Sequence, residues 1–544
     1  MASSKIFLGC MPELLNEIIQ YLQDDHGTLH SCILINRLWC RLAIPFLWKN
    51  PFSIKCPKNY CYIDVYLHDL SDDDKTKLNE YGIKISVFSS NTLFNYPGFF
   101  KCLKIHDFGL SIKEWIDAKI YKYSIRTFHQ HYLGLIYTFL IERFVKNEAN
   151  LHTFEFKGYY EDIIILEIIL QNPKFIYNIR NLFINFLSNN KITALLKLLL
   201  SNHNNSISKI YFQFRNIDNN INELTKNYSS QVINSQHNLK KLIIDDNSTN
   251  VTHLNHLLLS LKNSNCLNTL ETIIFYKINF KNIKFLKEVF EQLNVLESIH
   301  IFYCHFIHEF IQQIIHITKP FKLKSLYMDN EIIACGYDIT LIINSMQLLF
   351  QKSGKYLENI KLFDFMYDVS KELKEKSLEL IKNYCRNVKR FSSSIFNIKN
   401  AYLVLNIIEN FKQNLNYLTI HDHRKYKFSI ILLNLGQILP YKLEYLHLEF
   451  EAYDSYISDL EVFLKNFKNI FIEKLILQII GIQNVAAVVL PYIKKYIMKE
   501  KRVKYLATHA PKQVLANEGK EFKLYNIEYT SIWKIINDYT SDLL

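Results

Sequence analysis

The sequence predicts an α/β fold in which short parallel strands and helices alternate along a solenoid. A six-residue pattern starts thirteen times between residues 151 and 503, at a spacing of about 29 residues. Helical apolar periodicity fills the intervals, as in residues 282–293 and 309–319. Only 12 glycines occur in 544 residues, which disfavours a propeller with its many tight turns. We therefore expect strands on the concave side and helices on the convex side.

The repeated pattern has an aliphatic residue first and apolar residues at its fourth and sixth positions. It occurs as LHTFEF (151), IRNLFI (179), ISKIYF (207), LKKLII (239), LETIIF (270), LESIHI (296), LKSLYM (323), LENIKL (357), LNYLTI (415), LEYLHL (443), IEKLIL (472) and VKYLAT (503). VKRFSS (388) keeps the register with polar residues. Alternation with period two predicts a strand in each unit.

This unit resembles the leucine-rich repeat of the long, helix-containing type. Two units carry the Asn or Cys that the repeat places three positions after its last apolar residue, Asn247 and Cys304. The resemblance implies an array over residues 106–544 that presents its strand face to a protein target.

Strand alternation predicts which side chains form that face. If the fourth and sixth positions point into the core, the third, fifth and seventh point to the concave side. The substrate-binding candidates are Phe183, Tyr211, Tyr276, His300, Phe302, Tyr327, Phe363, Tyr417, His421, Tyr445 and His447. Exposed aromatic residues often anchor interfaces, although neighbouring units or loops could instead cover these rings.

The N-terminal segment predicts three short amphipathic helices. Pro12 suits the first turn of the first helix. Gly27 is expected to separate the first helix from the second, and Thr28 can cap the second helix. Three helices in about 40 residues cannot bury all of their apolar surface alone. We therefore expect a partner to cover part of it.

These residues resemble the F-box, the three-helix module that binds Skp-type adaptors of cullin-RING ubiquitin ligases. The resemblance implies adaptor contacts at Met11, Pro12, Leu15, Ile18, Leu29, Cys32, Ile35 and Trp39. Met11 replaces the usual first Leu. Residues 93–103, LFNYPGFFKCL, are similar to a segment that follows the F-box in large fungal families. The alternative is a plain helical cap of the solenoid.

The expected domain organisation follows from these resemblances. Residues 1–50 form the F-box, residues 51–105 form a connecting region that packs toward the array, and residues 106–544 form the leucine-rich-repeat-like solenoid.

Composition argues against several functional classes. The net charge of +12 is spread along the chain rather than gathered in a patch, so we expect no nucleic-acid partner. Ten irregularly spaced cysteines fit a reducing compartment. The N-terminus does not resemble a signal peptide, and the apolar runs are too short to cross a membrane. We expect a cytoplasmic or nuclear protein without membrane association.

Three clusters could suggest metal chemistry, but each has a simpler interpretation. Cys56, Cys61 and His68 lack the spacing of a zinc site. In HIFYCHFIH, Cys304 already serves as the buried small residue of its repeat. Ser71, which precedes three aspartates, is expected to cap a helix that ends near Gly82.

The chain is therefore predicted to be an adaptor and not an enzyme. It has no phosphate loop, nucleophile elbow or HExxH motif, and no cofactor or metal is expected. In this hypothesis the F-box binds the Skp adaptor and, through it, a cullin-RING ligase, while the array holds an unknown protein substrate for ubiquitin-dependent degradation. The alternative is a repeat scaffold for protein–protein interaction that recruits no ligase.

Overall fold

The computed structural model describes most of the chain. The described residues are 12–23, 25–53, 60–85, 92–119, 129–158, 160–186, 190–201, 206–214, 223–246, 251–319, 321–329, 339–362, 371–422, 428–451, 456–466, 470–480, 485–508 and 512–532. The chain divides into two compact units, Met1–Leu270 (unit 1) and Glu271–Leu544 (unit 2).

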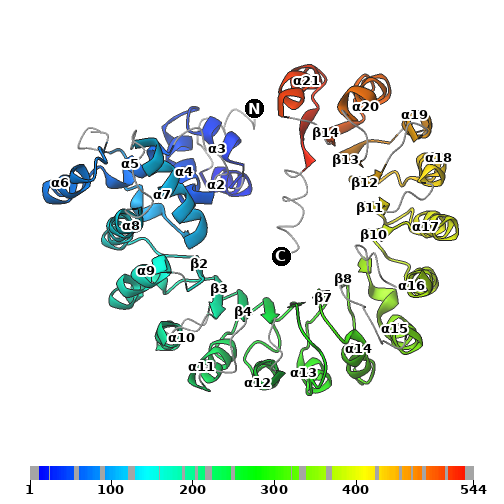
Figure 1. The fold of residues 1–544 in the computed structure, drawn as a ribbon, viewed down its shortest axis with the longest axis horizontal. Helices are drawn as coiled ribbons and strands as arrows, with labels where there is room; N and C mark the ends of the chain where they lie inside the picture. The colour runs from blue at the N-terminus through cyan, green and yellow to red at the C-terminus, as the bar shows by residue number, and fades with distance from the viewer. Residues whose placement is uncertain are drawn as a thin grey trace. The chain divides into compact units, whose positions relative to one another are not determined.

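Unit 1 consists of a helical N-terminal part and a parallel sheet backed by helices (Figure 1). Its strands are β1 (Cys102–Lys104), β2 (Thr153–Phe156), β3 (Asn181–Phe186), β4 (Lys209–Phe214) and β5 (Lys241–Asp246). Its α-helices are α2 (Pro12–Tyr21), α3 (His26–Cys32), α4 (Arg37–Trp48), α5 (Cys61–Leu67), α6 (Asp72–Glu80), α7 (Ile105–Lys119), α8 (His129–Lys146), α9 (Tyr160–Gln171), α10 (Asn190–Ser201), α11 (Glu223–Asn234) and α12 (Val251–Lys262). The strands pair in chain order.

Unit 2 repeats a strand followed by a helix (Figure 1). Its strands are β6 (Thr272–Tyr276), β7 (Ser298–Phe302), β8 (Ser325–Asp329), β9 (Asn359–Leu362), β10 (Arg390–Ser394), β11 (Tyr417–Asp422), β12 (Tyr445–Glu451), β13 (Ile472–Ile480), β14 (Val503–Thr508) and β15 (Glu528–Ser531). Its α-helices are α13 (Leu286–Gln292), α14 (Ile307–Ile315), α15 (Ile339–Ser353), α16 (Lys371–Tyr384), α17 (Ile398–Asn410), α18 (Ser429–Ile438), α19 (Tyr456–Asn466), α20 (Val485–Ile493) and α21 (Lys512–Leu524). Its strands also pair in parallel and in chain order.

The prediction of an α/β repeat is confirmed, and all thirteen pattern starts lead into a strand. In β11 the apolar side chains of Leu418 and Ile420 are fully buried, as the alternation requires. Within each unit the strands line one side and the helices the other (Figure 1). The polar instance at 388 forms β10, because its neighbours on both sides hold the register.

Two strands were not predicted. β1 lies in the segment expected to be a connecting region, and it pairs with β2 from Cys102 to Lys104. β15 pairs with β14 near the C-terminus. Their segments depart from the repeated pattern. Phe100 replaces the aliphatic first residue before β1, and Asn526 and Ser531 occupy the first and sixth positions around β15.

The N-terminal helices pack onto the first strands of unit 1. The Lys101 N–H donates to the Lys49 carbonyl at 2.9 Å, which ties the end of α4 to the start of β1. Phe52 packs on Phe108 of α7 with ring centroids 4.6 Å apart. Within the expected connecting region, Phe52 and Lys101 therefore contact helices of this unit, and residues 102–104 join its sheet.

Two capping expectations have different outcomes. The Oγ of Ser71 accepts a hydrogen bond from the Asp74 N–H at 3.1 Å, so Ser71 caps α6 as expected. The expectation for α3 is wrong, because Asp25 and not Thr28 is its N-cap. The Asp25 carboxylate accepts from the Thr28 N–H at 3.0 Å and from its hydroxyl at 2.6 Å. These hydrogen bonds lower the pKa of the Asp25 carboxyl.

Candidate functional site

The three N-terminal helices α2, α3 and α4 enclose a core of their own. Its buried members are Leu15, Ile19, Leu29, Cys32, Trp39 and Ala43. Asn36 caps α4, because its Oδ1 accepts from the N–H groups of Leu38 at 2.9 Å and Trp39 at 3.0 Å. The three helices form a small folded body whose apolar residues point largely inward.

This core contains four of the residues that the F-box resemblance assigned to adaptor contact. Leu15, Leu29, Cys32 and Trp39 are each at most 5% exposed. Their side chains hold the helices together and do not form a free surface. Ile18 is half-buried. Met11 lies outside the described residues, and Pro12 begins α2.

Other apolar side chains of the module face solvent. Leu34 is 75% exposed and Ile35 is 46% exposed, both in the turn between α3 and α4. Leu14 of α2 is 39% exposed. Of these three residues, only Ile35 was predicted to contact the adaptor. Their exposure follows from how the helices pack against one another, which apolar spacing alone does not specify.

The strand-face candidates are more covered than expected. Phe183, Tyr211, Tyr276, Phe302 and Tyr417 are half-buried, whereas His300, Tyr327, His421, Tyr445 and His447 are buried. Phe363 lies outside the described residues. For the five buried residues, the expectation of solvent exposure is wrong.

In-register stacking is the physical reason for this burial. Equivalent positions of neighbouring parallel strands lie about 4.8 Å apart, so large side chains cover one another. The rings of His300 and Tyr327 are 4.5 Å apart, and those of Tyr417 and Tyr445 are 5.8 Å apart. Phe183 contacts Tyr211 at 4.3 Å. The aromatic face is therefore mainly a packed layer.

A buried polar network joins β11, β12 and β13. The Nδ1 of His421 lies 2.9 Å from Oε2 of Glu449, and the Gln478 amide donates to Oε1 of Glu449 at 3.0 Å. The Nε2 of His447 lies 3.2 Å from Oε1 of Gln478. These contacts pair polar side chains that would be costly to bury alone.

Among the described residues, no group of His, Cys, Asp and Glu has the geometry to hold a metal ion. Cys304 is fully buried, and its sulfur accepts from the Ile278 N–H at 3.3 Å, as expected for the small residue of its repeat. His68 contacts the Val65 carbonyl through Nδ1 at 2.8 Å. Asn247 and Cys56 lie outside the described residues.

A basic cavity of about 750 Å³ in unit 1 was missed by the sequence analysis. It lies between the ends of α2 and α4 and the starts of β1 to β4. Its cationic residues are Lys49, Lys101, Lys104, Arg180 and Lys209. They are far apart in the sequence and meet only through strand register. Aligning the repeats by strand position would have shown that Lys101, Arg180 and Lys209 occupy the same or neighbouring positions of successive units.

Comparison with models of known protein families finds no match for this chain, and comparison with curated proteins finds none either. Within the described part of the chain, no helix is both long and apolar enough to cross a membrane.

Proposed function

We propose that this protein is the substrate-recognition subunit of a Skp–cullin–F-box ubiquitin ligase. The N-terminal helices would bind the Skp-type adaptor, and the repeat array would hold the target protein. Such a subunit acts by proximity, because it raises the effective concentration of target lysines near the charged conjugating enzyme.

One observation supports this proposal best. The helices α2–α4 bury a hydrophobic core of their own, yet Leu34 and Ile35, which are adjacent in one turn, remain exposed. Backbone hydrogen bonds hold that turn, with the Leu34 N–H on Ser31 and the Ile35 N–H on Cys32, each at 3.2 Å. Two rigidly presented aliphatic side chains are suited to an interface core.

The test is binding of the full chain to a purified Skp-type adaptor. Full burial of each aliphatic side chain contributes about 1.5–3 kcal/mol, so a Leu34→Asp/Ile35→Asp variant should lose at least about tenfold in affinity. The matched control is Leu524→Asp/Ile480→Asp, because these side chains are 79% and 45% exposed in unit 2. The control should bind like the wild type. Circular dichroism should show that both variants are folded.

Equal adaptor affinity of both variants would refute the assigned surface. Failure of the wild type to bind would favour the second candidate, a repeat scaffold that recruits no ligase. The packed core of α2–α4 also suits that role, because a helical cap must cover the end of a repeat array.

A further inference from the structure

The basic cavity of unit 1 is formed by strand register. The His152 N–H donates to the Lys101 carbonyl at 2.8 Å, and the Arg180 N–H donates to the His152 carbonyl at 2.8 Å. These residues precede β2, β1 and β3, so three basic residue types stand in one row. The next row of aligned residues, which begins at Cys102, contains Lys209 of β4. Lys104 of β1 lies two rows further along the strands.

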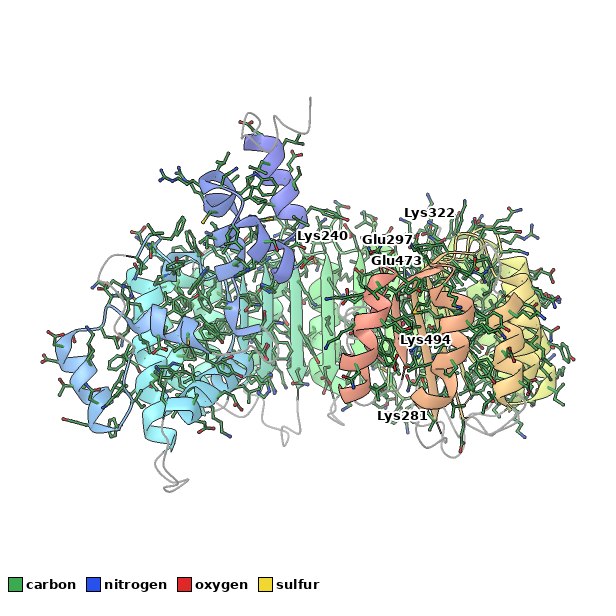
Figure 2. The ribbon with its side chains drawn as sticks, turned by 90° about the horizontal axis from the view of Figure 1, so that it is seen from above. Lys240, Lys281, Glu297, Lys322, Glu473 and Lys494 are labelled. Carbon is green, nitrogen blue, oxygen red and sulfur yellow. The ribbon has the colours of Figure 1, made fainter. Side chains whose placement is uncertain are left out.

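In β7 to β10 of unit 2, the lysines of the same row are paired with acids. There the Lys324 ammonium lies 2.6 Å from the Glu297 carboxylate, and the Lys389 ammonium lies 2.9 Å from the Glu358 carboxylate. Glu297 is labelled at the edge of the sheet in Figure 2. From Glu297 to Lys389, acidic and basic residues thus alternate along this row, and each of the two lysines has a carboxylate partner.

The described lining of the cavity is strongly cationic. Among the described residues that line it, the only acid is Glu155. Its carboxylate already lies 2.5 Å from the Lys157 ammonium. The described lining therefore holds five cationic side chains and one carboxylate, and that carboxylate is paired with Lys157.

Burial and mutual repulsion both act on these groups. Burial lowers the pKa of Lys101, and burial followed by the charge of Lys104 lowers the pKa of Lys209. The pKa of His152 is lowered by burial, then by Lys101 and Arg180. An anion in the cavity would relieve this repulsion.

We propose that the cavity binds a ligand that carries phosphate groups. Several lysines with an arginine match a multiply charged anion, and the planar guanidinium of Arg180 can donate two parallel hydrogen bonds to phosphate oxygens. A volume of about 750 Å³ lies in the range of small-molecule sites. The phosphate can belong to a free small molecule or to a phosphorylated side chain of a protein. This inference does not depend on the adaptor function.

The experiment measures binding of inorganic pyrophosphate to the full chain by isothermal titration calorimetry at fixed ionic strength. The cavity variant is Lys104→Gln/Arg180→Gln, because both side chains are exposed at the cavity and their loss should leave the fold intact. The control variant is Lys322→Gln/Lys442→Gln, which removes the same charge at exposed positions of unit 2. Lys322 is labelled in Figure 2.

We expect the cavity variant to bind pyrophosphate at least about tenfold more weakly than the wild type, and the control variant to bind like the wild type. A second titration with a phosphoserine peptide distinguishes the two sources of phosphate. Tighter peptide binding assigns a phosphorylated protein, and tighter pyrophosphate binding assigns a free phosphate compound.

Two results would overturn the proposal. One is that, for each probe, the wild type, the cavity variant and the control variant all bind with the same affinity, which would indicate diffuse surface charge. The other is no binding of either probe to the wild type. If the double variant unfolds, Lys104→Gln alone is measured, and an unchanged affinity would have the same meaning.

Discussion

His253 of α12 should make unit 1 sensitive to mild acid. Its side chain is 3% exposed, and neither ring nitrogen has a hydrogen-bond partner among the described residues. The ring packs on Phe214 at 4.1 Å and lies 6.3 Å from Phe186. Burial, followed by the charges of Lys226 and His256, lowers the pKa of His253 to about 3.

The direction and size of the effect follow from linkage. A histidine in the unfolded chain has a pKa of about 6.5. Below that pH the unfolded state binds a proton at His253, whereas the folded state does not bind it until the pH approaches 3. The stability contributed by neutral His253 is complete above about pH 6.5 and is lost as the pH falls toward 3. At about pH 5 the loss is 1.5 pH steps of about 1.36 kcal/mol, or about 2 kcal/mol.

The assay is urea unfolding at about pH 7.5 and about pH 5, followed by tryptophan fluorescence. Three of the 4 tryptophans belong to unit 1, so the signal reports mainly on that unit. Between the two pH values the wild type should lose about 2 kcal/mol more than a His253→Phe variant, which cannot take up the proton. A His237→Gln variant, changed at an exposed position, should follow the wild type.

Equal losses in the wild type and in His253→Phe would refute this reasoning. At about pH 7.5 the variant should be at least as stable as the wild type, because it removes two buried nitrogens without partners, each costing about 1 kcal/mol or more. If the larger phenylalanine ring disturbs the packing, His253→Leu is the second variant, and the pH-dependent difference should persist.

Five further substitutions, two matched pairs and one single variant, test the packing by urea unfolding. Leu15→Ala should cost about 2–5 kcal/mol because the side chain is fully buried, whereas Leu34→Ala at a 75% exposed position should change stability by less than about 0.5 kcal/mol. Gly354→Ala should cost about 1–3 kcal/mol because its Cβ would lie 2.9 Å from a backbone oxygen; in contrast, Gly519→Ala in α21, with 4.0 Å of clearance, should gain about 0.5–1 kcal/mol. Glu449→Ala should cost about 3 kcal/mol, since it leaves a buried histidine and a half-buried amide without their shared carboxylate. Equal effects within either matched pair, or a neutral Glu449→Ala, would contradict the packing described above.

Much of the repeat could be predicted from sequence. Alternation of apolar residues is local, and it specified the strands that follow each of the thirteen pattern starts. The capping of α6 by Ser71 was also predictable, because a cap needs only neighbours within one turn. β1 and β15 were missed because Phe100, Asn526 and Ser531 stand at positions where the repeated pattern has aliphatic or apolar residues.

The candidate sites were predicted less well, since exposure depends on what lies across from a residue. Leu15 of α2 and Leu34 of the turn after α3 are both leucines of the N-terminal module, but only packing makes one a core residue and the other a surface residue. His421 and Tyr445 occupy strand positions that alternation assigns to the open face, and their neighbours in adjacent strands bury them.

The sequence by itself determined the repeating strand and helix and the presence of three N-terminal helices, because these depend on side chains within a few residues of each other. Only the tertiary structure decided which aromatic side chains are covered, which aliphatic ones remain exposed, and that Lys101, Arg180 and Lys209 line one cavity. The physical reason is that parallel strands bring together residues that lie about 30 positions apart in the chain, so the charge density of that cavity belongs to the stacked repeats and to no single segment.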